Sequence, residues 1–322
     1  MFIMENRFWH PTIAPDHEPR RVTLVKGDWV DDRRRGRVVP YKIYIPDADP
    51  MMPDEKCPVI IWSHGLGGSR DGAGFLSRFV ASYGYIIVHI THIGTDTSLW
   101  EGKPGHPWDA IRATCRPRHT TLDRYRDIPF TIKMLRDISA KPDDPLGARM
   151  NLGALGMSGH SFGALTTQIM AGQRTQRGRR HYNLHQPEFK AGILYSPVPG
   201  RKDPEDPAFT YGGIRIPLFH MTGTDDESPI ENFGYKQRLT VFEHAGAPQH
   251  LVVLKGGDHM VFNGSRGGLG VNPARTRQED MIKILSLAWW DWHLRGDMAA
   301  RDWLSGPSGA AFVGDDAQIR EK

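Results

Sequence analysis

Residues 151–171, NLGALGMSGHSFGALTTQIMA, hold the pattern that decides the fold. Residues 152–157 are short and apolar, which is typical of a strand covered on both faces of a parallel sheet. Residues 164–171 favour a helix. Between them, residues 159–163 (GHSFG) form a Gly-x-Ser-x-Gly pattern. We therefore expect a buried strand, a tight turn that carries one serine, and a helix.

Ser161 is the serine of that pattern. The turn must be strained so that the hydroxyl stands clear of the backbone, and Gly159 and Gly163 leave room for the strand and helix to meet. Ser158 competes, but no glycine follows it two residues later. The alternative, an ordinary glycine-serine loop, lacks the required strand and helix. The pattern in its context predicts Ser161 as the functional serine.

A second glycine-rich turn follows an apolar strand. Residues 58–62 (PVIIW) lead directly into HGLGG at residues 64–68. A His-Gly-x-Gly turn in this place is typical of the first half of an oxyanion hole. We predict that the N–H groups of Leu66 and Phe162 are its two donors. The alternative is a plain glycine turn, and we interpret His64 as a side chain that braces the loop.

Two neighbouring carboxylates follow the predicted strand 216–221 (IPLFHM). A carboxylate at this point could hold a histidine in the correct tautomer and stabilise its imidazolium form. Asp226 and Asp225 are both candidates, and we favour Asp226. The alternative is a pair of acidic turn residues that cap a helix.

A histidine follows the last predicted strand, residues 251–254 (LVVL). His259 lies in the loop after it, where a general base is expected, although a surface histidine is the simpler alternative. The order Ser161, Asp226, His259 along the chain distinguishes one serine-hydrolase fold from the others. We predict these three residues as a catalytic triad, with no metal in the site.

The remaining pattern predicts an α/β fold in a single domain over residues 1–322. We expect a mostly parallel central sheet of about eight strands with helices on both faces. Alternating residues within 18–46 predict an antiparallel hairpin at the N-terminal edge of the sheet. Residues 275–295 carry an apolar face and predict a closing helix.

Residues 94–120 read as an irregular, lid-like insertion after a strand, where loops carry specificity. We interpret Trp100 and Trp108 as pocket wall or lid, although a packed surface loop explains them nearly as well. His160 and Met260 flank the predicted catalytic residues and complete the predicted substrate pocket. The aromatic residues of segment 94–120, together with Phe162, favour a moderately apolar acyl or alcohol group.

The composition is that of a globular enzyme: 39% of the residues are hydrophobic and the net charge is +4. Basic clusters lack interleaved aromatic residues, so we expect no nucleic-acid partner. We expect no metal, because the 15 histidines form no cluster at metal spacing. No signal peptide or apolar membrane span is visible, and we expect a cytoplasmic protein. Tryptophans near the C-terminus allow a homodimer interface, although core packing explains at least half of them equally well.

The chain resembles the α/β-hydrolases, in the branch of bacterial predicted dienelactone hydrolases and platelet-activating-factor acetylhydrolases. The stretches that carry the resemblance are SHGLGGSRDG (63–72), ASYGYIIVHITHIGTD (81–96), GMSGHSFGA (156–164), MTGTDDESPI (221–230) and GGDHMVF (256–262). The resemblance implies hydrolysis of small carboxylic esters through an acyl-enzyme, without a cofactor. It also implies the same triad and oxyanion donors.

The sequence departs from that branch in two places, so lactone specificity does not follow and the acid must come from the pair Asp225 and Asp226. Dienelactone hydrolases use a cysteine nucleophile, whereas position 161 is serine. In animal acetylhydrolases the acid follows the strand after the helix that the serine starts, but residues 194–196 (LYS) offer no carboxylate. An amidase, a peptidase or a phospholipid acetylhydrolase would use the same triad. A non-catalytic binding protein on a hydrolase scaffold is a further alternative.

Overall fold

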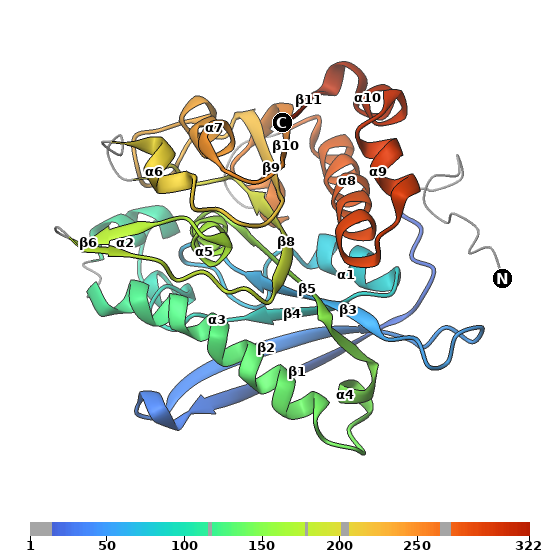
Figure 1. Cartoon of the computed structure of the whole chain (residues 1–322). Helices are drawn as coiled ribbons and strands as arrows, with labels where there is room; N and C mark the ends of the chain where they lie inside the picture. Colours follow the sequence, from blue (N-terminus) through green and yellow to red (C-terminus); the bar gives the residue numbers. More distant parts are fainter. Residues whose placement is uncertain (1–14, 115–117, 178–179, 201–205, 265–271) are drawn as a thin grey trace.

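A mixed sheet of nine strands forms the centre of the molecule (Figure 1). The computed structural model describes residues 15–114, 118–177, 180–200, 206–264 and 272–322. In spatial order the strands are β1 (Val22–Asp31), β2 (Arg37–Pro46), β4 (Ile86–Ile90), β3 (Cys57–Ser63), β5 (Met150–His160), β8 (Phe189–Tyr195), β9 (Leu218–Asp225), β10 (Gln249–Asp258) and β11 (Ala317–Glu321).

The strands β4, β3, β5, β8, β9 and β10 run parallel to one another. Antiparallel pairs occur at both edges, where β1 pairs with β2, β2 with β4, and β11 with β10. The predicted α/β-hydrolase architecture, with a mostly parallel sheet and an antiparallel N-terminal edge, is therefore confirmed. The carboxyl ends of the parallel strands meet at one edge, which is where open α/β sheets place their ligand sites.

Helices cover both faces of this sheet. They are α1 (Gly74–Ser82), α2 (Pro107–Ala113), α3 (Arg118–Ser139), α4 (Pro145–Arg149), α5 (Phe162–Ala171), α6 (Pro207–Tyr211), α7 (Tyr235–His244), α8 (Arg275–Arg295), α9 (Met298–Leu304) and α10 (Pro307–Val313). Within the described ranges, none of the helices combines the length and the apolar character that a membrane crossing requires.

Alternation along β3 shows how the two faces are filled. Ile60 and Trp62 belong to the core on the side of α1 and α8. Val59 and Ile61 belong to the core on the side of α3 and α5. Successive strand residues point to opposite faces, so a strand with helices on both sides must be apolar throughout. Figure 1 shows α8 in red and α3 in green on opposite sides of the sheet.

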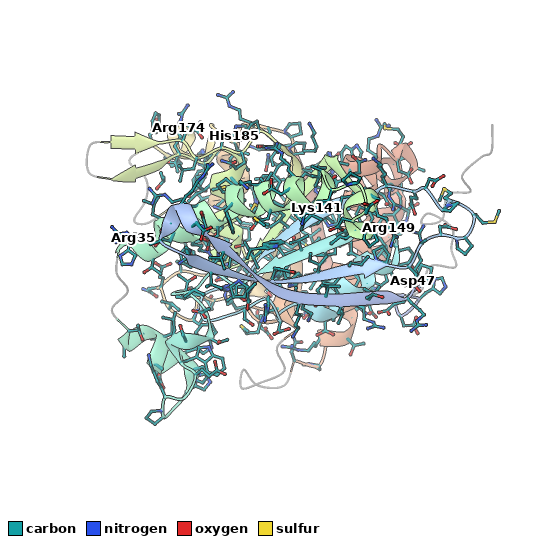
Figure 2. All side chains as sticks on the ribbon, turned by 90° about the horizontal axis from the view of Figure 1, so that it is seen from below. Arg35, Asp47, Lys141, Arg149, Arg174 and His185 are labelled. Atoms are coloured by element: carbon teal, nitrogen blue, oxygen red, sulfur yellow. The ribbon has the colours of Figure 1, made fainter. Side chains whose placement is uncertain are left out.

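The N-terminal hairpin turns through a short 3-10 helix, Asp32–Arg34. Arg35 and Gly36 follow in the left-handed region, with φ values of 59° and 70°. The side chain of Asp31 accepts a hydrogen bond from the Arg33 N–H group and caps the turn. Figure 2 shows Arg35 at one end of this hairpin and Asp47 at the other.

Several short elements of the structure differ from the sequence predictions. The ninth strand, β11, and the separate hairpin of β6 (Thr175–Arg177) with β7 (Arg180–Tyr182) were not predicted. The strand β11 is short and only Ala317 and Ile319 are partly buried, so its apolar alternation is too brief to predict a strand. The segment 94–120 is also less irregular than predicted, because it contains a 3-10 turn, Thr97–Leu99, and the helix α2. Residues 115–117 of that segment lie outside the described residues.

The start of α2 combines an ordinary helix signal with an unusual one. Pro107 occupies the first turn, where its missing N–H group costs nothing. The His106 side chain accepts a hydrogen bond from the Trp108 N–H group at 3.3 Å. A histidine is an unusual cap, so the sequence signal for this helix is weak.

Candidate active site

Ser161 occupies a strained turn between β5 and α5. Its φ is 55° and its ψ is −115°, a conformation that is costly for a residue with a side chain. The backbone holds this turn from both sides. The Ser161 N–H group donates to the Tyr195 carbonyl at 2.9 Å, and the Ser161 carbonyl accepts from the Leu165 N–H group at 3.0 Å. The serine is half-buried, as expected of a hydroxyl presented at the edge of a sheet.

The glycines on either side of this turn are sterically required. A Cβ atom on Gly163 would lie 1.8 Å from the carbonyl oxygen of Ser63. A Cβ atom on Gly159 would lie 2.5 Å from the carbonyl carbon of Gly163. The end of β5, the start of α5 and the end of β3 therefore pack backbone to backbone, which brings the loop after β3 next to Ser161.

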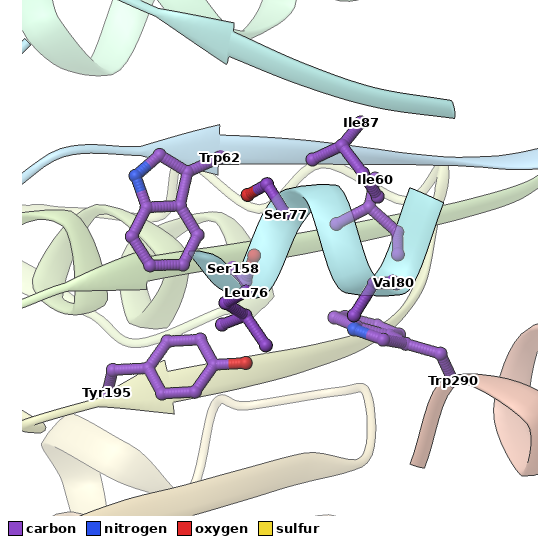
Figure 3. A pocket seen from close by; sticks show the side chains of 9 residues that line it. All are labelled: Ile60, Trp62, Leu76, Ser77, Val80, Ile87, Ser158, Tyr195 and Trp290. Carbon is purple, nitrogen blue, oxygen red and sulfur yellow. The ribbon is translucent and has the colours of Figure 1, made fainter. Parts of the chain in front are cut away.

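Ser158 lies in a different environment from Ser161. It lines a small, largely apolar pocket between the sheet and the helices α1 and α8 (Figure 3). The lining residues are Ile60, Trp62, Leu76, Ser77, Val80, Ile87, Ser158, Tyr195 and Trp290. This pocket is a gap in core packing on one face of the sheet. It does not lie at the edge where the turn presents Ser161.

A buried pair joins the predicted base to one of the two candidate acids. His259 Nδ1 lies 2.7 Å from Asp226 Oδ1. The other carboxylate oxygen of Asp226 accepts a hydrogen bond from Thr222 Oγ1 at 2.8 Å. Asp226 is fully buried, whereas Asp225 is exposed and pairs with the hydroxyl of Thr224. The geometry thus brings Asp226, and not Asp225, to His259.

The electrostatics keep this pair in the form that a base requires. Burial opposes the charged form of Asp226, but the Arg238 guanidinium and His259 outweigh it and lower the pKa of Asp226 to about 2. Burial is the main cause that lowers the pKa of His259 below its usual value, against the opposing effect of Asp226. Near neutral pH the pair is therefore a carboxylate and a neutral imidazole, which donates its Nδ1–H to Asp226 and leaves Nε2 as an acceptor.

His160 brings the base close to the serine. The ring centroids of His160 and His259 are 4.6 Å apart, and His160 Nε2 lies 2.7 Å from the His259 carbonyl oxygen. His160 directly precedes Ser161 in the chain. Among the described residues, no hydrogen bond joins the Ser161 hydroxyl to His259. In substrate-free enzymes such bonds are often long and tighten only when substrate binds.

The predicted oxyanion donors lie on the two segments that meet at the turn. A Cβ atom on Gly65 would lie 3.5 Å from Ser161 Cβ and 3.3 Å from the His160 carbonyl oxygen, which places the Leu66 loop beside the serine. Phe162 is the first residue of α5, where N–H groups have no partner within the helix and the helix dipole favours negative charge. Both features suit the binding of a developing oxyanion.

The segment after β4 supports the Leu66 loop. The Gly67 N–H group donates to the Thr95 carbonyl at 2.9 Å, and Trp100 Nε1 donates to the Gly67 carbonyl at 2.7 Å. Trp100 therefore lies against the loop that carries the predicted oxyanion donor Leu66. Ile111 of α2 also lies near Gly67, since a Cβ atom there would meet Ile111 Cδ1 at 2.5 Å.

The other predicted pocket residues occupy different positions. His160 is buried beneath the turn and packs against His259, so it supports the site from within. Met260 is half-buried and follows His259 directly. Trp108 is half-buried on α2, and among the described residues no hydrogen bond or ring contact joins its side chain to Ser161, Asp226 or His259. The same helix reaches the loop after β9, where Arg112 Nε donates to the Pro229 carbonyl at 3.0 Å.

Two buried arginines next to the site were not predicted. Arg124 of α3 donates to Ser63 Oγ and Thr95 Oγ1, each at 2.9 Å, and to the carbonyl of His64; its guanidinium lies 4.4 Å from the centre of the Phe162 ring. Arg238 of α7 forms an ion pair with Asp226. Burial, the main cause, lowers the pKa of Arg124 to about 9. A charged residue on the apolar stripe of each helix was the sequence signal for both.

No metal site was expected, and the described part of the chain contains no group of three or more His, Cys, Asp or Glu residues placed to hold a metal ion.

Comparisons with known proteins point to serine hydrolases. The family model "Platelet-activating factor acetylhydrolase, isoform II" matches residues 37–100, which include the Leu66 loop. The family model "Serine hydrolase (FSH1)" matches residues 107–263, which include Ser161, Asp226 and His259. A Schizosaccharomyces pombe protein described as "Putative phospholipase A2" is 29% identical over 177 residues. That match covers 44% of this chain and 40% of the relative's length. Together with the sheet topology, these matches support a serine hydrolase of the α/β-hydrolase superfamily.

Proposed function

We propose that this protein hydrolyses carboxylic esters through an acyl-enzyme formed on Ser161. The observation that carries the proposal is the strained Ser161 turn beside the Leu66 loop, with the buried Asp226–His259 pair close to it. A strained serine at a strand-to-helix turn is the arrangement that presents a nucleophile in this superfamily. A neutral histidine held by a carboxylate is the partner that such a serine needs.

In the first half-reaction, Ser161 Oγ attacks the ester carbonyl carbon while His259 Nε2 takes the hydroxyl proton. The carbonyl electron pair moves to oxygen, and the N–H groups of Leu66 and Phe162 stabilise that oxyanion. The electron pair then returns, the carbon–oxygen bond to the alcohol breaks, and His259 gives its proton to the departing alkoxide. Asp226 holds His259 in the required tautomer and stabilises the imidazolium.

In the second half-reaction, water attacks the acyl-enzyme. His259 takes a proton from the water, a second oxyanion forms in the same site, and Ser161 leaves with the proton returned by His259. The products are the carboxylic acid and the regenerated enzyme. Every proton transfer uses His259, so the proposal needs no cofactor.

The test compares three proteins on p-nitrophenyl esters from acetate to decanoate: wild type, Ser161→Ala and Ser158→Ala. We expect Ser161→Ala to lose on the order of 10⁶-fold in kcat, because the triad acts as a unit. Ser158→Ala is the matched control, since Ser158 lines the core pocket. Labelling by a fluorophosphonate probe should likewise require Ser161. Full activity of Ser161→Ala would overturn the proposal, and faster cleavage of the matched p-nitroanilide would turn it toward an amidase.

A phospholipid substrate is the second candidate, favoured by the acetylhydrolase family match and by the description of the yeast relative. It uses the same chemistry, because the acyl group at the sn-2 position of a phospholipid is a carboxylic ester. Phosphatidylcholines with an sn-2 acetyl or a long sn-2 acyl chain would test it. Preference for the acetyl lipid over p-nitrophenyl acetate would support an acetylhydrolase, and no release from either lipid would exclude both lipid activities.

A further inference from the structure

Arg238 adds a third buried charge to the Asp226–His259 pair. Its side chain is 1% exposed, and its Nη2 atom lies 2.9 Å from Asp226 Oδ1. The same Nη2 atom lies 3.1 Å from His259 Nδ1. Because Nδ1–H of a neutral His259 donates to Asp226 Oδ1, two donors converge on one carboxylate oxygen. A carboxylate oxygen can accept both bonds, so the arrangement is satisfied with Asp226 as a carboxylate, Arg238 charged and His259 neutral.

The other nitrogen atoms of the Arg238 guanidinium bind backbone carbonyls of the loop that carries Asp226 and of the loop beside it. Arg238 Nε donates to the Asp226 carbonyl at 3.0 Å. Its Nη1 donates to the carbonyls of Ser196 and Pro197 at 3.3 and 2.9 Å. One side chain therefore binds the loop after β8, the loop after β9 and the catalytic carboxylate. The planar fork of arginine can make all these bonds at once, which a lysine could not.

We propose that Arg238 is a positioning residue that fixes Asp226 against His259 and whose positive charge disfavours protonation of His259 in the resting enzyme. The proposal rests on the proposed function above, in which His259 is the general base. Arg238 would thereby extend the pH range of activity to lower pH, because a general base that resists protonation stays active in more acidic solution.

The charges around His259 give the sign of the effect. Asp226 and Asp258 favour the imidazolium, whereas burial and Arg238 oppose it. The adjacent His160 is neutral near pH 7, because burial and His259 lower its pKa to about 3. If the charge of Arg238 were removed, Asp226 and Asp258 would act without that opposition. The pKa of His259 would then rise.

Three replacements separate the charge of Arg238 from its hydrogen bonds. Arg238→Gln removes the charge but keeps a donor for the backbone carbonyls. Arg238→Met removes both and fills the volume beside the Phe233 ring, which lies 4.9 Å from the guanidinium. Arg238→Lys keeps the charge and loses the fork. Arg320→Met is the control, because Arg320 is exposed on β11 and stacks 5.1 Å from Phe242 of the same helix α7.

The first measurement is an NMR titration of the His259 imidazole in the Ser161→Ala background, which requires no turnover. We expect Arg238→Gln and Arg238→Met to raise the pKa of His259 by about 1–3 units, the usual effect of a charge at this distance. Arg238→Lys and Arg320→Met should stay close to the parent. Neutral variants that fold and titrate like the parent would overturn the electrostatic part of the proposal.

The second measurement is the pH profile of kcat/KM with the Ser161 hydroxyl intact. The acidic limb should move to higher pH in the two neutral variants by the same amount as in the titration. Arg238→Lys should lower kcat without moving that limb, because only positioning is lost. Wild-type kcat for Arg238→Lys would overturn the positioning part. If the wild type cleaves no ester and resists the fluorophosphonate, the proposed function fails, while the titration still decides the effect of the charge.

Discussion

The Nδ1 atom of His64 lies 2.6 Å from the carbonyl oxygen of Gly65. That carbonyl belongs to the same peptide group as the Leu66 N–H, and the two bonds of a trans peptide point in opposite directions. The Gly68 N–H group holds the same carbonyl at 3.1 Å. Fixing the Gly65 carbonyl therefore fixes the direction of the predicted oxyanion donor.

The protonation of His64 suits this function. Its Nε2 accepts a hydrogen bond from the His92 N–H group at 2.9 Å, so the single ring proton must reside on Nδ1. Burial, the main cause, and the charge of Arg124 hold the pKa of His64 well below its usual value. The ring is thus a neutral donor to Gly65, which agrees with its interpretation from the sequence as a brace for the loop.

His64→Phe should lower kcat while KM changes little. The Leu66 N–H acts on the transition state, and losing one such donor outright costs on the order of 10²-fold or more in kcat. Because the Gly68 N–H group still holds the Gly65 carbonyl, we expect a loss up to that size. His220→Phe is the matched control, since His220 is a buried histidine that bonds Gln249. Steady-state kinetics of both variants checks this, and an equal loss in both would show a general effect of replacing a buried imidazole.

The region around Ser161 could be predicted, because the local sequence pattern and the tertiary packing both require the same turn there. Its glycines are required by close backbone contact with Ser63, and the apolar strand before them and the helix after them identify a strand-to-helix turn. The strand β11 could not be predicted, because it is a short edge strand whose side chains face mostly solvent. Its place in the sheet is set by pairing with β10, a contact between residues far apart in the sequence.

The site residues also divide into those that the sequence could predict, such as His259 and Asp226, and those that it could not, such as Arg124 and Arg238. His259 and Asp226 follow strands whose carboxyl ends meet at one edge, so their proximity follows from topology. Arg124 and Arg238 lie inside helices that also carry many solvent-exposed charges. Whether such an arginine turns inward depends on what lies opposite: here Asp226 for one, and hydroxyl and carbonyl groups for the other. A single sequence shows that each arginine lies on the apolar face of its helix, but it does not show which group the arginine binds.

Asp226→Asn should reduce kcat far more than Asp225→Asn. Asparagine cannot hold His259 in the required tautomer, and such a change costs on the order of 10⁴-fold in serine hydrolases. It also leaves Arg238 without a carboxylate, so we expect a loss of stability of about 3–5 kcal/mol. Asp225 is exposed and bonds Thr224, so its variant should stay close to wild type. Kinetics and urea unfolding of both variants test this, and the reverse ranking would assign the acid to Asp225.

The buried carboxylate of Asp127 should govern the stability of the folded protein at low pH. That carboxylate accepts hydrogen bonds from Arg37 Nε at 2.8 Å and Arg34 Nη1 at 2.7 Å, and lies 3.0 Å from His92 Nδ1. The ring of His92 continues through its Nε2 to Ser63 Oγ at 3.0 Å. Burial opposes the carboxylate, but Arg37 and His92 outweigh it and lower the pKa of Asp127 to about 2. The ion cluster thus reaches the end of β3, beside the predicted oxyanion loop.

A carboxyl group whose pKa is lowered by folding stabilises the protein above its unfolded pKa of about 4. That contribution, on the order of 2 kcal/mol, is lost as the pH falls from about 4 to 2. Asp127→Asn should therefore be less stable at pH 7 and lose less stability than wild type across this window. Urea unfolding from pH 7 to pH 2 measures both effects. Asp123→Asn on the same helix is the control, since Asp123 is only partly buried and lies 4.0 Å from the exposed Arg126. Parallel curves for wild type and Asp127→Asn would show that Asp127 does not govern acid unfolding.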